Sequence, residues 1–341
     1  DALLANTTAD NNTAVGMDAL TANTTASNNT AVGKDALYAN TTGTANTGVG
    51  KSASYTNTTA SNNTAVGFQA LYTNAGASNT AVGHNALFNS TTGTENTAVG
   101  KSAMENNTSG HSNTAVGEAA LDAHTTGSGN VAVGRDALGA NTTASNNTAV
   151  GLNALLVNTT GSENTCVGRG AGDAVTTGAN NVLIGYDAGS DALTTITTTN
   201  NNIIIGNVNS SNAEIACSWT EGSDVRDKTD IETLPDNAGL NFVNQMRPVT
   251  YVWDKRVNYN KPTDENFGER DHSKKSTTKQ VGFIAQEIKA IEETIGWTDD
   301  HIVNTSNEQS HKMKYNQLIP IITKAIQELS AKVEELEDKL K

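Results

Sequence analysis

The chain has 341 residues, of which 22 are Lys or Arg and 36 are Asp or Glu, so its formal net charge is −14. This acidic balance argues against a nucleic acid or an anionic membrane surface as the main partner. Only 17% of the residues are charged and 4% are aromatic, whereas a conventional enzyme core of this length would use more Leu, Phe and Ile. No run of 18 apolar residues occurs, so we expect no membrane insertion.

The N-terminus lacks a basic region followed by an apolar stretch, so we expect no signal peptide. The first residues already lie inside a repeat, which indicates a piece of a longer protein. Cys166 and Cys217 are too few for a disulfide scaffold, and we expect both to be small buried residues.

The composition changes near Gly206. All four prolines and all three tryptophans follow it, and the charged residues number 18 in the first 206 positions but 40 in the remaining 135. Such a shift marks a boundary between two architectures. We therefore predict a repeat domain over residues 1–206 and a junction or tip over residues 207–222.

The first half is built on the motif Asn-Thr-Ala-Val-Gly. Its glycine recurs every 17 residues, with one step of 16 and a last step of 21, and an Asn stands four residues before each glycine. The twelve glycines are Gly16, Gly33, Gly50, Gly67, Gly83, Gly100, Gly117, Gly134, Gly151, Gly168, Gly185 and Gly206. This period is too short for helix-pair repeats and predicts one coil of a β-solenoid.

The motif also predicts the parts of a coil. Strand side chains alternate, so Thr and Val point to one face, and we expect small Ala and Val to fill a narrow interior together with the Ala-Leu segment that follows the glycine. The glycine permits a positive φ or a close approach at the turn. Equivalent Asn side chains are expected to form a ladder of hydrogen bonds from coil to coil, and the NTTAS and NTTG stretches are expected to be loops.

One coil this thin buries little, and several chains side by side would enlarge the interior. The repeat resembles the head domains of trimeric autotransporter adhesins, whose repeats also combine Asn, small residues, Val or Ile and Gly. The resemblance implies a homotrimer of left-handed parallel β-rolls. A single-chain β-helix is the structural alternative.

Other residues of the repeat carry little chemical signal. The Asn-x-Thr triplets belong to the repeat and are not expected to be glycosylated. His84, His111 and His124 occupy different repeat positions, and Asp187 and Asp191 are expected to be surface carboxylates, so we predict no metal site. The glycines follow the structural period rather than a strand-to-helix turn, so we predict no phosphate loop and no cofactor.

Four motifs follow in the second half, at residues 223–231, 246–251, 281–288 and 315–320. Together they resemble the intramolecular chaperone auto-processing domain at the C-terminus of phage tailspikes and tail fibres such as endosialidases. This resemblance implies a small α+β chaperone domain over residues 223–314. The same domain occurs in bacterial surface fibres and in a eukaryotic membrane-bound transcription factor, so it does not by itself indicate a phage.

The resemblance also implies that Ser223 and Lys228 form a self-cleavage dyad. A serine hydroxyl attacks only when a base takes its proton, and a lysine becomes such a base when it is desolvated. Gly222 would let the backbone bend toward the hydroxyl. The bond broken lies beside Ser223, either Gly222–Ser223 or Ser223–Asp224. We expect this single-turnover serine-type cleavage and no turnover enzyme.

Periodicity predicts the supporting structure. The spacing of Ile284, Ile288, Ile291 and Ile295 predicts one face of a helix that stops near Gly296. Residues 251–253 are typical of a strand, and residues 258–279 of a solvated loop.

A C-terminal coiled coil is expected over residues 315–341. Its apolar residues are spaced alternately by four and three: Tyr315, Ile319, Ile322, Ile326, Leu329, Val333, Leu336 and Leu340. Pro320 fits the first turn, and Lys332 and Glu337 fall at g and e positions, where they can pair between chains. Ile319 with Ile322 favours three strands, whereas Val333 with Leu336 favours two. The upstream repeat decides for three.

These features predict a mostly β protein with a trimeric fibre segment, a self-removing chaperone and a trimeric coiled coil. We expect a phage tail fibre in the virion, with itself and a host glycan or protein receptor as partners. Residues 207–222 are a candidate contact. The alternative is a bacterial trimeric adhesin at the cell surface. A glycan-degrading tailspike is less favoured, because it needs a carboxylate pair in a cleft and the repeats offer few acids at matched positions.

Overall fold

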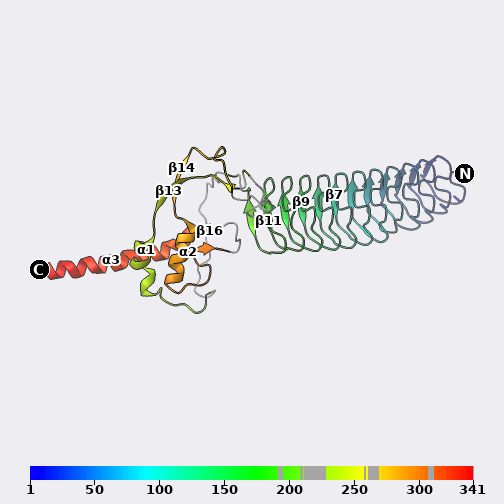
Figure 1. The fold of residues 1–341 in the computed structure, drawn as a ribbon. Helices are drawn as coiled ribbons and strands as arrows, with labels where there is room; N and C mark the ends of the chain where they lie inside the picture. Colours follow the sequence, from blue (N-terminus) through cyan, green and yellow to red (C-terminus); the bar gives the residue numbers. More distant parts are fainter. Residues whose placement is uncertain are drawn as a thin grey trace. The chain divides into compact units, whose positions relative to one another are not determined.

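The computed structural model describes residues 1–190, 195–207, 210, 228–256, 259, 269–305 and 311–340. They belong to two compact units, Asp1–Ser211 and Asn212–Lys341. Each unit is described by itself below, with the elements labelled in Figure 1.

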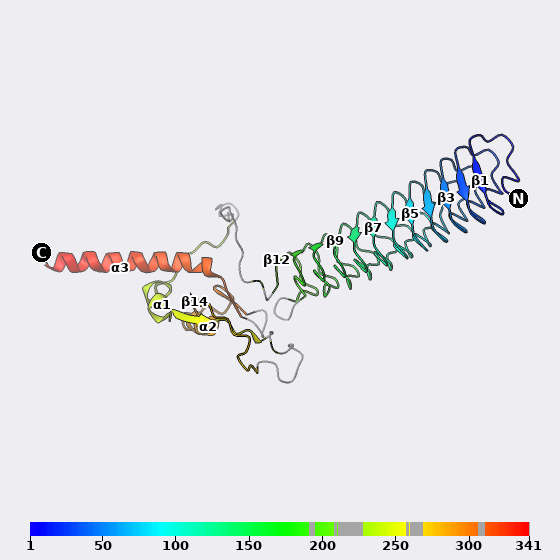
Figure 2. The same cartoon turned by 90° about the horizontal axis from the view of Figure 1, so that it is seen from above.

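The first unit is a parallel β-solenoid, as predicted. Each coil contributes one three-residue strand. The strands lie side by side in chain order and form a 12-stranded sheet, as Figures 1 and 2 show. The strands are β1 (Thr13–Val15), β2 (Thr30–Val32), β3 (Thr47–Val49), β4 (Thr64–Val66), β5 (Thr80–Val82), β6 (Thr97–Val99), β7 (Thr114–Val116), β8 (Val131–Val133), β9 (Thr148–Val150), β10 (Thr165–Val167), β11 (Val182–Ile184) and β12 (Ile203–Ile205).

The prediction of which side of the strand faces inward was wrong for Val. The central residue of the strand is the buried one: Ala31, Ala65 and Ala98 have no exposed surface. The Thr and Val on either side of it point outward, and Val116 keeps 37% of its surface exposed. Alternation separates the two faces but does not say which is inside. Where the Leu is present, the strand centre carries only a small residue, whereas Leu183 is fully buried at the strand centre beside Gly189, which replaces the Leu.

The Leu of the Ala-Leu segment is fully buried in a left-handed backbone conformation. Leu71 and Leu121 have φ values of 51° and 54°, a region that a Leu rarely adopts. Strain of about 1–2 kcal/mol at such a residue is offset by about 1.5–3 kcal/mol from burying the side chain. The row therefore stays apolar in most coils even though glycine would fit its backbone better.

The predicted ladder of Asn side chains is confirmed. At every step from Asn12 to Asn202 the side-chain Oδ1 accepts the backbone N–H of the equivalent Asn in the next coil, at 2.8–3.0 Å. The amide nitrogen bonds a backbone carbonyl, as from Asn29 to Gly43 at 3.0 Å. These bonds satisfy buried polar groups that would otherwise cost about 1–3 kcal/mol each.

The repeating glycine is required for two reasons, both as predicted. Gly67 has a φ of +138°, and a Cβ there would lie 2.3 Å from the carbonyl oxygen of Gly83 in the next coil. Any side chain would force the coils apart.

Coil length varies without disturbing the sheet. The 16-residue coil still pairs Thr64 with Thr80, and the 21-residue step still pairs Val182 with Ile203. The 16-residue coil is shorter just after its buried Asn74, whose amide bonds the carbonyl two residues on instead of three. In the 21-residue step the coils keep their ordinary spacing as far as Asp187, which bonds Arg169, and are offset by 21 from Thr197, which bonds Thr176.

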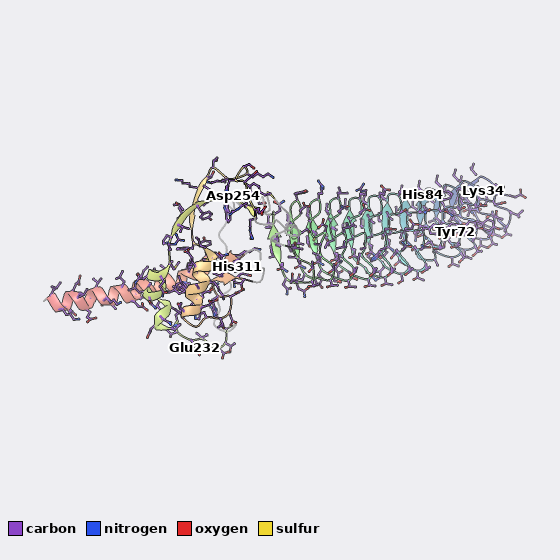
Figure 3. The ribbon with its side chains drawn as sticks, in the orientation of Figure 1. Lys34, Tyr72, His84, Glu232, Asp254 and His311 are labelled. Atoms are coloured by element: carbon purple, nitrogen blue, oxygen red, sulfur yellow. The ribbon has the colours of Figure 1, made fainter. Side chains whose placement is uncertain are left out.

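Outward rows also stack like on like. The rings of Tyr38, Tyr55, Tyr72 and Phe88 stack in succession, with centroids 5.0–5.2 Å apart, and Tyr72 is labelled in Figure 3. Contact between identical side chains in neighbouring coils is thus a property of the exterior as well as of the core.

The second unit is small and mixed. Its elements are η2 (Asp236–Ala238), α1 (Leu240–Gln245), β13 (Val249–Val252), β14 (Lys279–Gly282), α2 (Ala285–Thr294), β15 (Val303–Asn304), β16 (Lys312–Met313), η4 (Tyr315–Gln317) and α3 (Leu318–Leu340). The strands form two antiparallel pairs, β13 with β14 and β15 with β16. The core consists of Phe242, Ile288, Ile291, Ile302, Val303, Leu318 and Ile321. The predicted helix is confirmed as α2, which ends just before Gly296 at φ +86°.

Candidate processing segment and assembly helix

Of the predicted processing residues, only Lys228 belongs to the described part of the chain. Gly222, Ser223 and Asp224 lie outside the described residues, and so does Cys217. Lys228 is exposed in the single chain. The geometry of the dyad therefore stays a prediction, and the described site begins with the segment that follows it.

That segment, residues 228–235, lies in part against the first turn of α3. Leu234 packs against the core of the unit. Leu234 and Pro235 line a cavity of about 300 Å³ together with Trp297, Pro320 and Ile321. The last two belong to the first turn of α3. The residues just downstream of the predicted dyad are thus attached to the base of the long helix.

Polar contacts extend this attachment along α3. Lys324 lies 3.5 Å from Asp236 and 3.5 Å from Glu328. The Glu328 carboxylate accepts the backbone N–H of Leu240 at 2.8 Å, so it holds the start of α1, where a negative charge is favourable. A change in the position of α3 would therefore break or shift the contacts that hold residues 236–240.

The three downstream motifs meet in one place. Arg247 and Glu287 form an ion pair, which holds the pKa of the Glu287 carboxyl below its ordinary value. In the β13–β14 pair, Thr250 lies opposite Val281. The Tyr315 hydroxyl accepts the backbone N–H of Phe283 at 3.3 Å. Residues recognised separately in the sequence thus form one contact network.

Besides Glu328, two acidic residues in this unit were not predicted. Glu292 is fully buried on the apolar face of α2, and its Oε1 accepts the backbone N–H of Ile302 at 2.6 Å. An acid between Ile288 and Ile295 on an apolar helix face was the available signal. Glu292 ties the end of α2 to the segment before β15.

The second is Asp254, labelled in Figure 3. Its carboxylate accepts a hydrogen bond from the Tyr259 hydroxyl at 2.7 Å and lies 2.5 Å from Nδ1 of His272. These contacts, with Tyr259 the largest, lower the pKa of Asp254. The Arg270 guanidinium donates to the Asp254 backbone carbonyl at 2.8 Å. Apart from Tyr259 and Ser276, the described residues of the predicted solvated loop are exposed, but this cluster fastens its base.

The heptad residues of α3 lie on an exposed apolar seam. Between 43% and 88% of each side chain's surface is exposed, and the seam consists of Ile319, Ile322, Ile326, Leu329, Val333, Leu336 and Leu340. Only Leu318, Ile321 and Ala325, on another face, are buried against the unit. An exposed apolar stripe of this length marks an association surface. Tyr315, the first heptad residue, instead contacts its own chain.

In the part of the chain that the structure describes, no three His, Cys, Asp or Glu side chains are grouped so as to hold a metal ion. Over the same residues, no helix combines the length and apolar character needed to cross a membrane.

Comparison with known proteins gives a family match for part of the second unit. Residues 223–296 match the family described as chaperone of endosialidase. No curated protein and no solved structure matches the chain. The chain therefore carries an endosialidase-type chaperone domain preceded by β-solenoid repeats. The long helix α3 lies beyond the matched residues.

Proposed function

We propose that the chain is part of a homotrimeric phage tail fibre, carried in the virion and used for attachment to a host glycan or protein. Residues 1–206 form the fibre and residues 207–222 its tip. Residues 223–314, with the coiled coil 315–341, form a chaperone that drives trimerisation and then cleaves itself off. The match of residues 223–296 supports the chaperone, and the exposed seam of α3 is the observation that carries the proposal.

The solenoid explains why a chaperone is needed, and the seam of α3 explains how the chaperone acts. Each solenoid coil contacts only its neighbours, so three chains must find the same register before contacts between them form, which is slow. A parallel three-stranded coiled coil of α3 sets number, direction and register first. The solenoids then grow from chain ends that are already aligned.

Cleavage follows assembly in this scheme. The Ser223 Oγ attacks the carbonyl carbon of an adjacent peptide bond, and Lys228 Nζ takes the hydroxyl proton. The C–N bond breaks, the leaving nitrogen receives that proton, and water releases the acyl group from Oγ. A lysine amine in water near neutral pH is almost entirely protonated, and burial favours its neutral form. Lys228 is exposed in the single chain, so partner copies would have to bury it, which makes cleavage conditional on the trimer.

Light scattering of the full chain tests the assembly step. At micromolar concentration we expect a trimer, and Ile326→Asp should yield monomer because it places three charges in the seam. Gln327→Asp introduces the same residue one position away, on an exposed face outside the seam, and should remain trimeric. A wild-type monomer, or equal behaviour of the two variants, would contradict the proposal.

A further inference from the structure

The outer face of the 12-stranded sheet has an unusual composition. Each strand presents two side chains outward, and all of them are Thr, Val or Ile. The residue before each glycine is always Val or Ile, which gives a continuous apolar row: Val15, Val32, Val49, Val66, Val82, Val99, Val116, Val133, Val150, Val167, Ile184 and Ile205. We call the two outward rows together the sheet face.

The sheet face contains none of the 18 charged residues of the first half. They lie in the rows after the glycine and in the loops, as Lys101 and Glu118 do, where they pair at 3.2 Å. The face of a sheet that is in contact with water ordinarily carries polar or charged side chains. Strand propensity favours β-branched residues, but it does not explain why one row is apolar in every coil.

The apolar row is also partly exposed along its length. Val32, Val116, Val133 and Val167 each keep 36–38% of their surface exposed, although neighbouring coils already cover them on two sides. Contiguous apolar surface of this extent on a single chain indicates an interface.

We propose that the sheet face packs against the sheet face of other copies of this chain, parallel and in register. Identical coils make the face self-complementary in register, because each Val meets the same Val at the same height. With no charge present, no ion has to be paired or desolvated at cost, and the Thr hydroxyls are the polar side-chain groups that the interface has to satisfy. The Val and Thr rows together would bury on the order of the ~800 Å² per partner typical of specific interfaces.

The number and direction of the copies rest on the proposed function, whereas the choice of face does not. A coiled coil of α3 fixes three parallel chains, and only then must one particular face of each solenoid turn toward the common axis. The rows that carry Lys, Arg, Asp and Glu would remain outside, in contact with water.

Site-specific crosslinking of the full chain tests the face. In a Cys166→Ala, Cys217→Ser background, Val133→Cys places a thiol on the sheet face, and Thr143→Cys places one on an exposed loop in the coil that follows β8. A short bismaleimide should join Val133→Cys chains into dimers and trimers on a denaturing gel and leave Thr143→Cys as single chains. The reverse pattern in a chain that scatters light as a trimer would overturn the face and leave the trimer intact.

Charge substitution gives an independent readout. Val116→Lys with Val133→Lys should raise the dissociation constant at least tenfold, whereas Thr126→Lys with Thr143→Lys should leave it unchanged. Far-UV circular dichroism should be the same for both, since all four positions point outward. Crosslinking of Val133→Cys that persists in an Ile326→Asp chain would support the face and refute the helix as the driver. A monomeric wild type would overturn both proposals.

Discussion

The carboxylate of Glu328, ten residues into α3, accepts the backbone N–H of Leu240, the first residue of α1, at 2.8 Å. The carboxylate also lies close to the backbone of Gly239, since a Cβ on that residue would lie 2.4 Å from it. The Glu328 side chain is therefore one of the links between the exposed helix α3 and the segment that follows the predicted processing site.

Glu328→Ala should loosen α1 from α3 and lower the stability of the second unit by about 1–3 kcal/mol, the usual loss for a hydrogen bond to a charged group. All three tryptophans lie in this unit, and Trp297 is 6.2 Å from Phe242 of α1 between ring centroids, so tryptophan fluorescence during urea unfolding reports on it. Glu334→Ala, exposed on the same helix, is the control. Equal urea midpoints for Glu328→Ala and Glu334→Ala would show that the Glu328 bond to Leu240 does not stabilise this unit.

The dyad makes a prediction about fragments. Wild-type chain should yield pieces of about 222 and about 119 residues, because the broken bond lies beside Ser223, and mass spectrometry of the pieces assigns the bond. Ser223→Ala and Lys228→Met should each stop cleavage and leave the trimer intact, since each removes a reacting group and no large apolar surface.

Lys228→Arg separates chemistry from charge. Guanidinium keeps the positive charge but stays protonated and cannot serve as a base, so this variant should remain uncut on a denaturing gel. Full cleavage in Lys228→Arg would show that Lys228 acts only as a charge. An uncut wild type would show that the domain chaperones without processing.

His124 gives the solenoid a specific sensitivity to acid. It is fully buried, one ring nitrogen contacts the Gly127 carbonyl at 2.8 Å, and burial lowers the pKa of the ring below its ordinary value of 6.5. Below about pH 6.5 the unfolded chain therefore binds a proton that the folded chain does not. The free energy of unfolding should fall as the pH drops from 7 to 5, by up to about 1.4 kcal/mol per unit.

His124→Asn restores the residue that most other coils carry there and should flatten this dependence, measured as the melting temperature at a series of pH values. His111→Asn, on the exposed surface, should leave the slope as in the wild type. Parallel curves for His124→Asn and wild type would mean that other groups cause the acid sensitivity.

Ser54 marks a gap in the solenoid core. It occupies the buried Leu position of its coil at φ 51°, and Gly48 replaces the inward Ala of the same coil. The apolar core is divided there into two clusters, one ending at Leu37 and the other beginning at Ala53. Ser54→Leu should join the clusters and stabilise the solenoid by about 1–2 kcal/mol.

The opposite substitution calibrates this prediction. Leu71→Ser, one coil further on, should cost about 2–5 kcal/mol, because it opens a cavity and buries a hydroxyl. Both changes are measured by thermal unfolding followed at the far-UV signal of the sheet. A Ser54→Leu variant that melts below the wild type would show that Leu37 already fills the space.

Much of the solenoid could be predicted from the period alone. The glycine row and the Asn ladder follow from contacts that each coil makes with an identical neighbour. Which face of the strand is buried could not be predicted, because alternation is the same whichever face lies inside. The volume of the buried Leu row, as at Leu71, decides it. Nor could the left-handed Leu row, since local preference opposes it and only burial supports it.

In the second unit, sequence patterns identified what is periodic or shared with a family. The α3 seam and the helix α2 follow from spacing, and the motifs that meet at Arg247 and Glu287 follow from resemblance. Glu292 was marked only by its place on the apolar face of α2, whereas Asp254 and Glu328 were missed because a single acid that bonds a group farther along the chain leaves no pattern. Its partner is fixed by the tertiary fold.

The tolerance of the solenoid for coils of 16 and 21 residues has a practical consequence. Since strand register is kept in the 16-residue coil, the loop that follows its buried Asn74 is a site where peptides can be grafted. An epitope or a recognition loop inserted beside Ser78 would be displayed at a defined height along the solenoid. Duplicating whole 17-residue units would lengthen the solenoid in fixed increments and leave both ends unchanged.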